Sequence, residues 1–572
     1  MAVAECFGPC IAQACIFARF GSVYSYPVLP VFHSSTRLGK ATRWVKRAPS
    51  EAALFTGMVL LHLLPLWSFR YFATTDGPSH LYNAWATKVL LTHTPHPVHQ
   101  AFAINSGPVP NYLTQVLLVS ALHLLPPWLA EKLVQTLYVV GLSLALRYVV
   151  RAWRPGAGFL ALLAFPLVYS AVFQYGFYNF CLSVVLFLVV LGYWRRHFFA
   201  RLPTLRHVVG LASLLLVLYF AHPLPYLLAG FVVGLCVLEE AWRLPGPASR
   251  LTYLRTRLSI LLIACLPSLF LMGWYLSQPT VEELVSVVSI GPGQLLHDWV
   301  MLEPLRFMGS AEGTYRKLLA ALLFGLVGYV GWCHARGRAL APAGALALAA
   351  GLLVLAYVLL PDALLGGSIL RPRLGLLSYL LLIGLLATVS YPRRLRQAVV
   401  SVVVVVAVLL LGFRYGKYRT LATGMDEYRT ATSYLRPGAS IASFSYGAIS
   451  RMPNGKAYQS YIDVFPHATG YLGVERQLLN LENYEAHTGY FPVVWRPGQA
   501  VMTDRDEQPP RINWQTTPRT QWPDYVLLWG RNVQVVPTTN AQQLESHLAQ
   551  HYHLVYRSPT KLLELYSEGP AG

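Results

Sequence analysis

The chain carries little charge for its length: 12% of its 572 residues are Asp, Glu, Lys or Arg, whereas 55% are apolar. A soluble globular protein carries about 25% charged residues, so the composition excludes a protein that is soluble along its whole length. Cysteine is also scarce, because none of the seven follows Cys333, and Cys6, Cys10 and Cys15 lack the paired spacing of a zinc site. The sequence therefore predicts neither a disulfide framework nor a zinc module.

Several binding motifs are absent as well. The polar C-terminal part has no glycine-rich phosphate loop and no nucleophile elbow. No basic face is interleaved with aromatic residues, so nucleic acid is not a predicted partner.

Long apolar runs recur between Glu51 and Phe413. A hydrocarbon core about 30 Å thick needs roughly 20 apolar residues per helix, and this rule predicts a polytopic α-helical membrane protein with about eleven spans. We place these spans at residues 52–72, 129–150, 158–174, 176–194, 207–221, 224–241, 258–276, 316–334, 340–360, 369–390 and 397–413.

Composition divides the chain into three parts. Residues 1–50 lack the order of a signal peptide and are predicted to form a disordered cytoplasmic arm. Residues 51–413 form the transmembrane domain, with external loops at 71–128, where surface helices are expected, and at 277–315.

Residues 414–572 have the composition of a soluble domain. Short apolar stretches alternate there with Pro, Gly and Asn turns and with a helical pattern over 541–550, which predicts a small extracytoplasmic α/β domain. The apolar stretches lie at 440–445, 524–529, 553–557 and 561–566.

The basic residues indicate an orientation. Residues 1–413 hold 30 Lys and Arg against 12 Asp and Glu, whereas residues 414–572 hold 15 against 13. The basic clusters fall in alternate loops, and short cytoplasmic loops retain such clusters. They lie at 37–47, 147–154, 195–206, 243–257, 336–338 and 393–396. The sequence thus predicts a multi-pass protein of the cell (inner) membrane with a cytoplasmic N-terminus and an extracytoplasmic C-terminal domain.

One apolar segment, 112–126, would reverse part of this orientation if it crossed the bilayer. It has only about 15 residues, fewer than a span needs, and it ends in Pro126-Pro127. We therefore favour a re-entrant or interfacial helix over a span.

The stretch YFATTDGPSHLYNA at 71–84 follows the first span. Asp76 lies at the outer end of the first span and precedes a Gly-Pro turn. A helix lying on the membrane surface is predicted from Ser79 to Leu91. A carboxylate at this boundary meets both lipid-borne and water-borne substrates, and burial can tune its pKa for base catalysis. The alternative is that Asp76 only N-caps the helix, and the residues alone leave both open.

The pattern Asp76-Gly-Pro-Ser-His80-Leu-Tyr-Asn-Ala84, between a first span and a surface helix, resembles the GT-C superfamily of integral membrane glycosyltransferases. That superfamily includes the protein O-mannosyltransferases and the aminoarabinose transferases of lipid A. Later stretches are similar as well: Pro110-Asn-Tyr112, FQYGFYNF at 173–180 and His222-Pro-Leu-Pro225.

The resemblance implies a sugar donor on a polyprenyl phosphate, presented from the membrane lipids to the extracytoplasmic face. Asp76 would act as the base on an acceptor hydroxyl, with inversion at the anomeric carbon, and His80 would assist it or contact the acceptor. The candidate substrate-binding residues are Asn83, Tyr112, Tyr178, Asn179 and His222. The sugar and the acceptor stay open.

One departure from the family concerns metal. Many members carry two acidic residues in or near the first loop, whereas Asp76 is the only one between Arg70 and Ala130. The sequence therefore establishes no cofactor with certainty, and a divalent metal stays open but is not favoured.

Two arginines are expected to bind the donor phosphate. Arg371 and Arg373 lie at the external end of the tenth predicted span, where a cation near the hydrocarbon carries a cost. The planar guanidinium group suits phosphate oxygens, and the alternative is that both side chains reach lipid headgroups. We expect this pair to converge with Asp76 at the outer rim of an apolar pocket.

Two other classes of function stay open on the residues alone. A transporter or flippase for a lipid-linked substrate needs ionisable residues at mid-membrane depth, and the predicted spans hold few. A non-enzymatic membrane anchor for the C-terminal domain would leave Asp76 without a role.

Overall fold

The computed structural model describes most of the chain between Ser50 and Gly569. The predicted N-terminal arm lies outside the described residues, apart from its last position. The described ranges are 50–199, 203–277, 290–364, 367–446, 462–489, 491–503, 509–533 and 538–569.

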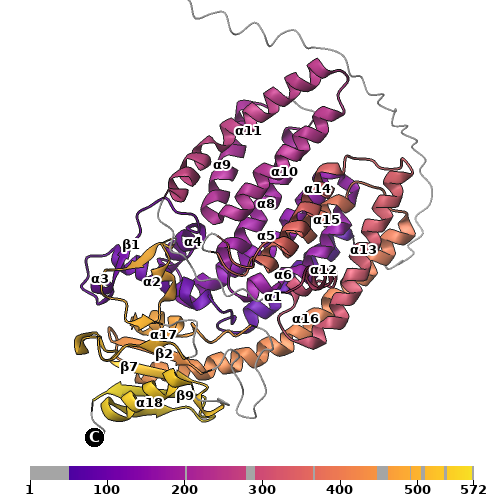
Figure 1. The fold of residues 1–572 in the computed structure, drawn as a ribbon. Coiled ribbons are helices and arrows are strands. Elements are labelled where there is room, and N and C mark those ends of the chain that lie inside the picture. The colour runs from indigo at the N-terminus through magenta and orange to yellow at the C-terminus, as the bar shows by residue number, and fades with distance from the viewer. Residues whose placement is uncertain are drawn as a thin grey trace, which may run out of the picture. The chain divides into compact units, whose positions relative to one another are not determined.

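The protein is a polytopic α-helical membrane protein (Figure 1). Within the described ranges, seven helices are long and apolar enough to cross a bilayer. They are α1 (Glu51–Ser68), α5 (Pro127–Trp153), α8 (Tyr178–His197), α10 (Pro223–Trp242), α11 (Pro247–Leu276), α13 (Gly313–Ala335) and α16 (Arg393–Arg429). Each coincides with a predicted span.

Four further predicted spans form shorter elements, so the predicted count of eleven is not confirmed. Three of them are helices of 16 or 17 residues: α9 (Leu205–Ala221), α14 (Gly344–Leu359) and α15 (Leu370–Leu386). The segment at 112–126 forms α4 (Leu113–Leu122), whose ten residues rise about 15 Å, half the hydrocarbon thickness.

The remaining predicted span, 158–174, is not one helix. It forms a 3₁₀ helix, η1 (Pro155–Leu163), followed by the short helices α6 (Ala164–Val168) and α7 (Ala171–Gln174). Irregular backbone at membrane depth is tolerated where protein surrounds it, and residues 157–174 are all buried. Because the helix is broken here, the Gln174 and Tyr175 carbonyl groups are available as acceptors. They accept the backbone N–H groups of Thr75 and Asp76.

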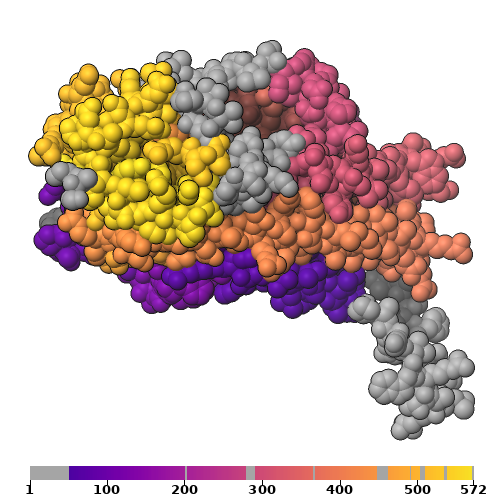
Figure 2. All heavy atoms as spheres, turned by 90° about the horizontal axis from the view of Figure 1, so that it is seen from below, coloured from indigo at the N-terminus to yellow at the C-terminus, as the bar shows by residue number. Residues whose placement is uncertain are grey.

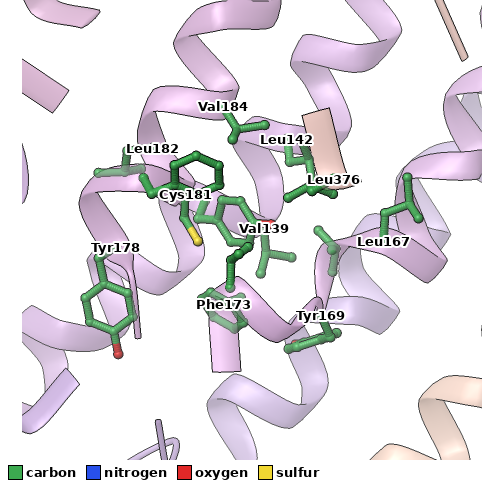
Figure 3. Close-up of a cluster of buried hydrophobic side chains, with 14 of the residues drawn as sticks. Val139, Leu142, Leu167, Tyr169, Phe173, Tyr178, Cys181, Leu182, Val184 and Leu376 are labelled. Carbon is green, nitrogen blue, oxygen red and sulfur yellow. The ribbon is translucent and has the colours of Figure 1, made fainter. Parts of the chain in front are cut away.

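An aromatic and aliphatic core fixes this broken segment. Phe173 stacks on Tyr138 of α5 with ring centroids 5.0 Å apart. Cys181 of α8 and Leu376 of α15 belong to the same buried cluster (Figure 3). Helices α5, α8 and α15 thus hold the end of α7 against the loop that carries Asp76.

Helix α16 continues for 37 residues, about 55 Å at 1.5 Å per residue. It therefore runs without interruption through the predicted domain boundary at residue 414, and the division into domains stays a prediction. Its last turns contact the C-terminal residues: Ser558 Oγ donates to Glu427 Oε1 at 2.5 Å, and Tyr428 packs on Trp529. Figure 2 shows these C-terminal residues, in yellow, beside the orange helix.

The C-terminal residues form the α/β fold that the sequence predicts. The four apolar stretches become β2 (Ser440–Ser445), β7 (Tyr525–Trp529), β8 (Tyr552–Arg557) and β9 (Leu563–Glu568). With β3 (Leu479–Asn480) they make a sheet in the order β3-β2-β7-β9-β8, in which β2 is parallel to β3 and β7 and the other pairs are antiparallel. The predicted helix is α18 (Thr539–His551), whose Leu544 and Leu548 join the core on this sheet.

A buried ion pair fixes α16 to the broken segment. Arg414 Nε lies 2.6 Å from Glu312 Oε1, and Arg414 Nη1 donates to the Tyr169 carbonyl at 2.6 Å. The second carboxylate oxygen of Glu312 accepts the N–H groups of Phe307 and Met308, each at 2.9 Å. Both charges are therefore satisfied although their side chains are 2% and 0% exposed.

Replacing Arg414 by Ala leaves the Glu312 carboxylate buried without its cation. We expect the free energy of unfolding to fall by about 3–5 kcal/mol, measured as a lower midpoint of denaturant unfolding in detergent. Arg419→Ala, on an exposed position of the same helix, is the control and should leave the midpoint unchanged. Equal midpoints for the two variants would contradict a stabilising role for the pair.

Candidate active site

The backbone around Asp76 is fixed from two sides. Its N–H donates to the Tyr175 carbonyl at 2.9 Å, and the N–H of Thr75 donates to the Gln174 carbonyl at 3.2 Å. Helix α2 (Gly77–Leu90) begins immediately afterwards, with Pro78 in its first turn. The side chain of Asp76 makes no capping hydrogen bond to this helix, so the capping interpretation does not account for the carboxylate.

Two glycines allow the backbones to meet at this point. A Cβ atom on Gly77 would overlap Thr74 Oγ1 and Tyr178 Oη and would lie 2.5 Å from Glu131 Oε1. Gly176 has φ +84°, and a Cβ there would lie 2.7 Å from the Gly77 nitrogen. The close approach brings a second buried carboxylate, Glu131, next to the residue that follows Asp76.

Helix α2, which the sequence predicts as a helix lying on the membrane surface, is buried by other parts of the protein. Every residue from Gly77 to Ala86 is buried, because α17 (Thr469–Arg476) packs against it. The packing is tight: a Cβ on Gly470 would overlap the Pro78 carbonyl, and a Cβ on Gly473 would lie 2.7 Å from the Tyr82 ring. Residues 462–489 and 491–496, which include α17, are called the docking segment below.

The docking segment is joined to the first loop along its length. Strand β1 (Phe102–Ile104) of the loop pairs antiparallel with β4 (Val493–Trp495) of the segment. Tyr82 Oη donates to the Leu478 carbonyl at 3.0 Å and accepts the N–H of Asn480 at 2.9 Å. The first loop and the docking segment therefore form one structure around Asp76.

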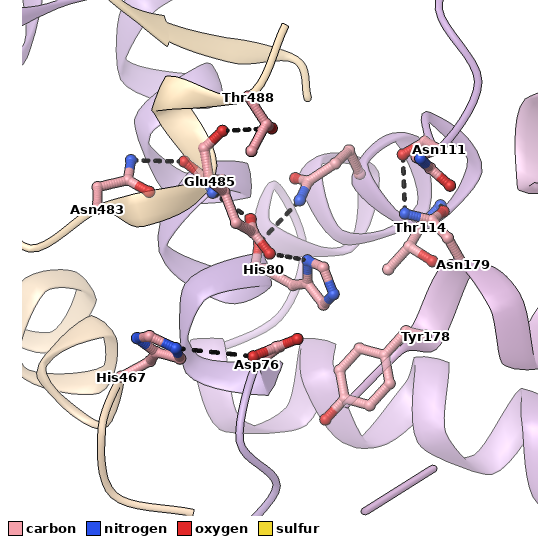
Figure 4. A network of polar contacts seen from close by, with 12 residues as sticks. Asp76, His80, Asn111, Thr114, Tyr178, Asn179, His467, Asn483, Glu485 and Thr488 are labelled. Atoms are coloured by element: carbon pink, nitrogen blue, oxygen red, sulfur yellow. Dashed lines mark hydrogen bonds and ion pairs between the residues drawn. The ribbon is translucent and has the colours of Figure 1, made fainter. Parts of the chain in front are cut away.

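The docking segment supplies charged groups to Asp76 (Figure 4). His467 Nε2 lies 3.8 Å from Asp76 Oδ1, and His467 Nδ1 lies 2.6 Å from Glu482 Oε1. The ring of Tyr484 stacks on His467 with centroids 4.2 Å apart, and its side chain also hydrogen-bonds Asp76.

A second imidazole–carboxylate pair lies one helical turn along α2. His80 Nδ1 is 2.9 Å from Glu485 Oε1, and both side chains are almost fully buried. Asn83 Nδ2 donates to Glu485 Oε2, while Asn483 Nδ2 donates to Asn83 Oδ1 at 2.8 Å. The structure thus brings together three sequence-predicted residues, Asp76, His80 and Asn83. Their partners come from the docking segment, which includes η5 (Tyr484–His487).

Burial and charge shift the pKa values of these groups. Burial raises the pKa of Asp76 to about 6, and the positive charges of His467 and His80 limit the rise. Burial opposes a charge on His467, but attraction to Glu482 and the hydrogen bond that the ring donates to this carboxylate outweigh it and raise the pKa of His467 to about 9. Glu485 raises the pKa of His80 in the same way. At neutral pH the site therefore holds an ionised Asp76 beside a charged His467.

Three other predicted residues contact the first loop and its surroundings. Tyr112 Oη donates to the Asn105 carbonyl, and Asn179 Oδ1 accepts the N–H of Thr114 at 2.8 Å. Tyr178 Oη donates to Glu131 Oε1 at 2.8 Å. These side chains support the loop, and their contact with a substrate stays a prediction.

The two arginines lie in different surroundings. Arg373 Nη1 is 3.3 Å from His222 Nε2, and its guanidinium group lies 4.4 Å from the centre of the Phe177 ring. Phe177 stacks on Tyr175, the residue whose carbonyl accepts the N–H of Asp76. Arg371 instead follows the loop of Asp362, and its backbone N–H donates to Asp362 Oδ1 at 2.7 Å. Two aromatic residues therefore connect Arg373, but not Arg371, to Asp76.

The sequence analysis missed the polar and charged residues of the docking segment that lie near Asp76 and His80. His467, Glu482, Tyr484 and Glu485 lie about 400 positions after Asp76 in a part assigned to a separate domain. A usable signal was present on α2, because His80 and Asn83 need polar partners wherever that helix is covered. Among the described residues, no three His, Cys, Asp or Glu side chains are grouped to hold a metal ion.

Comparisons with known proteins bear on the fold. No protein-family model and no curated protein matches the chain. The structure is similar to ArnT from Cupriavidus metallidurans in the apo state, with TM-score 0.52 and 14% identity over 91% of this chain and 100% of that one. The same ArnT bound to undecaprenyl phosphate gives TM-score 0.50 and 13% identity over 91% and 99%.

A third similar structure is the arabinofuranosyltransferase AftD from Mycobacteria, with TM-score 0.47 and 16% identity over 91% of this chain and 40% of that one. The likeness to ArnT, with a TM-score of 0.52, covers 91% of this chain. The chain therefore has the membrane fold of ArnT, and the predicted fold class, a polytopic α-helical membrane protein with a C-terminal α/β part, is confirmed.

Proposed function

We propose that the protein transfers a sugar from a polyprenyl-phosphate-linked donor to an acceptor hydroxyl on the extracytoplasmic face of the inner membrane, with inversion. The observation that carries the proposal is the Asp76 carboxylate, which is buried, makes no capping bond and lies 3.8 Å from the imidazole of His467. The fold shared with ArnT, which one structure describes bound to undecaprenyl phosphate, supports the choice of a lipid-phosphate donor.

Asp76 acts as the general base. It accepts the proton of the acceptor hydroxyl as the acceptor oxygen forms a bond to the anomeric carbon. The bond between that carbon and the phosphate oxygen breaks, and its electron pair leaves with the polyprenyl phosphate. Attack from the face opposite the phosphate inverts the anomeric centre, and the phosphate gains one negative charge that needs stabilisation.

Arg373 and His222 supply that stabilisation. The N–H of Leu224 donates to His222 Nδ1 at 3.2 Å, so the proton of a neutral ring is on Nε2. This Nε2 faces Arg373 Nη1 at 3.3 Å, and two facing donors are suited to share one anionic oxygen. The phosphate of the donor is the anion we assign to them.

The proposed orientation follows the basic loops: a cytoplasmic N-terminus and an extracytoplasmic C-terminal part. The docking segment then lies on the same side as the first loop and its Asp76. The acceptor enters from this side, and the lipid chain of the donor stays in the bilayer.

Replacing Asp76 by Asn removes the base and preserves the side-chain volume. We expect sugar transfer to fall by about 10²–10⁴-fold, measured with radiolabelled pentoses and hexoses on undecaprenyl phosphate and an envelope fraction as the acceptor. The wild-type rate should rise with pH through about 6, as Asp76 loses its proton. Asp426→Asn, at a side chain 69% exposed on α16, is the control, and transfer that survives in Asp76→Asn would exclude the proposed base.

Replacing Arg373 by Gln removes a charged donor to the phosphate. A hydrogen bond to a charged group contributes about 1.5–3 kcal/mol, so the affinity for undecaprenyl phosphate should fall by about 10- to 100-fold. Arg371→Gln is the comparison and should have the smaller effect. Uncharged undecaprenol should bind all three proteins equally, and a matching loss for undecaprenol would refute phosphate binding by Arg373.

A further inference from the structure

His467 has no role in the transfer step described above, although it contacts the proposed base. Its two ring nitrogens face two carboxylates, Asp76 at 3.8 Å and Glu482 at 2.6 Å. The side chains of His467, Asp76 and Glu482 are 19%, 12% and 9% exposed. The imidazole thus lies between two largely buried acids from distant parts of the chain.

The backbone on either side of His467 is fixed. The ring of Phe465 stacks on Trp529 of β7 with centroids 4.8 Å apart, and the His467 carbonyl accepts the N–H of Gly470 at the start of α17. Thr75 Oγ1, next to Asp76, donates to the Asp463 carbonyl at 2.6 Å. The sheet, α17 and the Asp76 loop together determine the distance between imidazole and carboxylate.

The surroundings of Asp76 are rich in negative groups. Glu485 of η5 faces it from the docking segment, and Glu131 of α5 lies beside Gly77, whereas the neutral Tyr484 side chain hydrogen-bonds it. Tyr175 lies next to it on the α7 side, and among the described residues the other imidazole near it, His80, is paired with Glu485. A buried carboxylate among other acids is costly unless a cation is close, and His467 supplies the contacting positive charge.

We propose that His467 is a positioning residue for Asp76: its imidazolium, held by Glu482, keeps the Asp76 carboxylate ionised and oriented to accept a proton. The docking segment thereby completes the site in the first loop. Using Asp76 as the base rests on the proposed function, whereas the ion pair itself is measurable without a sugar donor. The elevated pKa of His467, about 9, agrees with a ring that stays charged at neutral pH.

The test is the pH dependence of carbodiimide labelling of Asp76 in the full-length protein in nanodiscs. N,N′-dicyclohexylcarbodiimide reacts with protonated carboxyl groups, and peptide mass spectrometry quantifies the product on Asp76. Labelling of the wild type should fall as pH rises through about 6. His467→Gln should move the midpoint upward by about one pH unit or more, because a cation within about 4–6 Å lowers a carboxyl pKa by 1–3 units.

Two further variants separate charge from shape. His467→Asn keeps a donor near the position of Nδ1 and has no charge, so it should shift the midpoint like the Gln variant, and it replaces that variant if the latter does not fold. His467→Lys restores a cation and should return the midpoint towards the wild-type value. His123→Gln, at an exposed histidine after α4, should leave the midpoint unchanged.

The proposal is overturned if the neutral variants keep the wild-type labelling midpoint. It is also overturned if the midpoint of His467→Lys stays at the value of the neutral variants. These outcomes are distinct from failure of the proposed function, which would appear as sugar transfer that survives in Asp76→Asn. If both proposals hold, the acid limb of the transfer rate should shift in each His467 variant by the same number of pH units as the labelling midpoint.

Discussion

The structure depends on the burial of a carboxylate where two distant parts of the chain meet. Asp76 and Glu131 come from the membrane part, and His467, Glu482 and Glu485 come from the docking segment. Isolated buried charges are strongly unfavourable, so such groups persist where partners of opposite charge and hydrogen bonds surround them. The contact between α2 and α17 therefore determines both the packing of the C-terminal residues and the chemistry of Asp76.

The membrane part holds the other side of this contact. The broken segment from η1 to α7 ends in carbonyl groups that accept the N–H groups of Thr75 and Asp76, and Arg414 of α16 fixes the break at Tyr169. Because α16 also carries the C-terminal sheet, one long helix connects the membrane core to the docking segment. The two halves of the site are thus held by the same helix bundle.

Charges of opposite sign are arranged on either side of the aromatic pair Tyr175 and Phe177. Arg373 and His222 lie on one side, and Asp76 with its carboxylate-rich neighbours lies on the other. In the transfer that we propose, this separation would place a cation close to the leaving group and a base close to the nucleophile, at opposite ends of one displacement.

The sequence by itself determined the class of protein, the seven long helices, four of the five strands of the C-terminal sheet and the position of Asp76 before a helix. These follow from local rules: apolar runs of membrane length, short apolar stretches between turns and a Gly-Pro turn. The tertiary structure alone decided that residues 158–174 break, that α2 is covered, and that His467 and Glu482 contact Asp76. Each of these depends on groups hundreds of positions apart that satisfy one another's charges and hydrogen bonds, and no local pattern records such pairing.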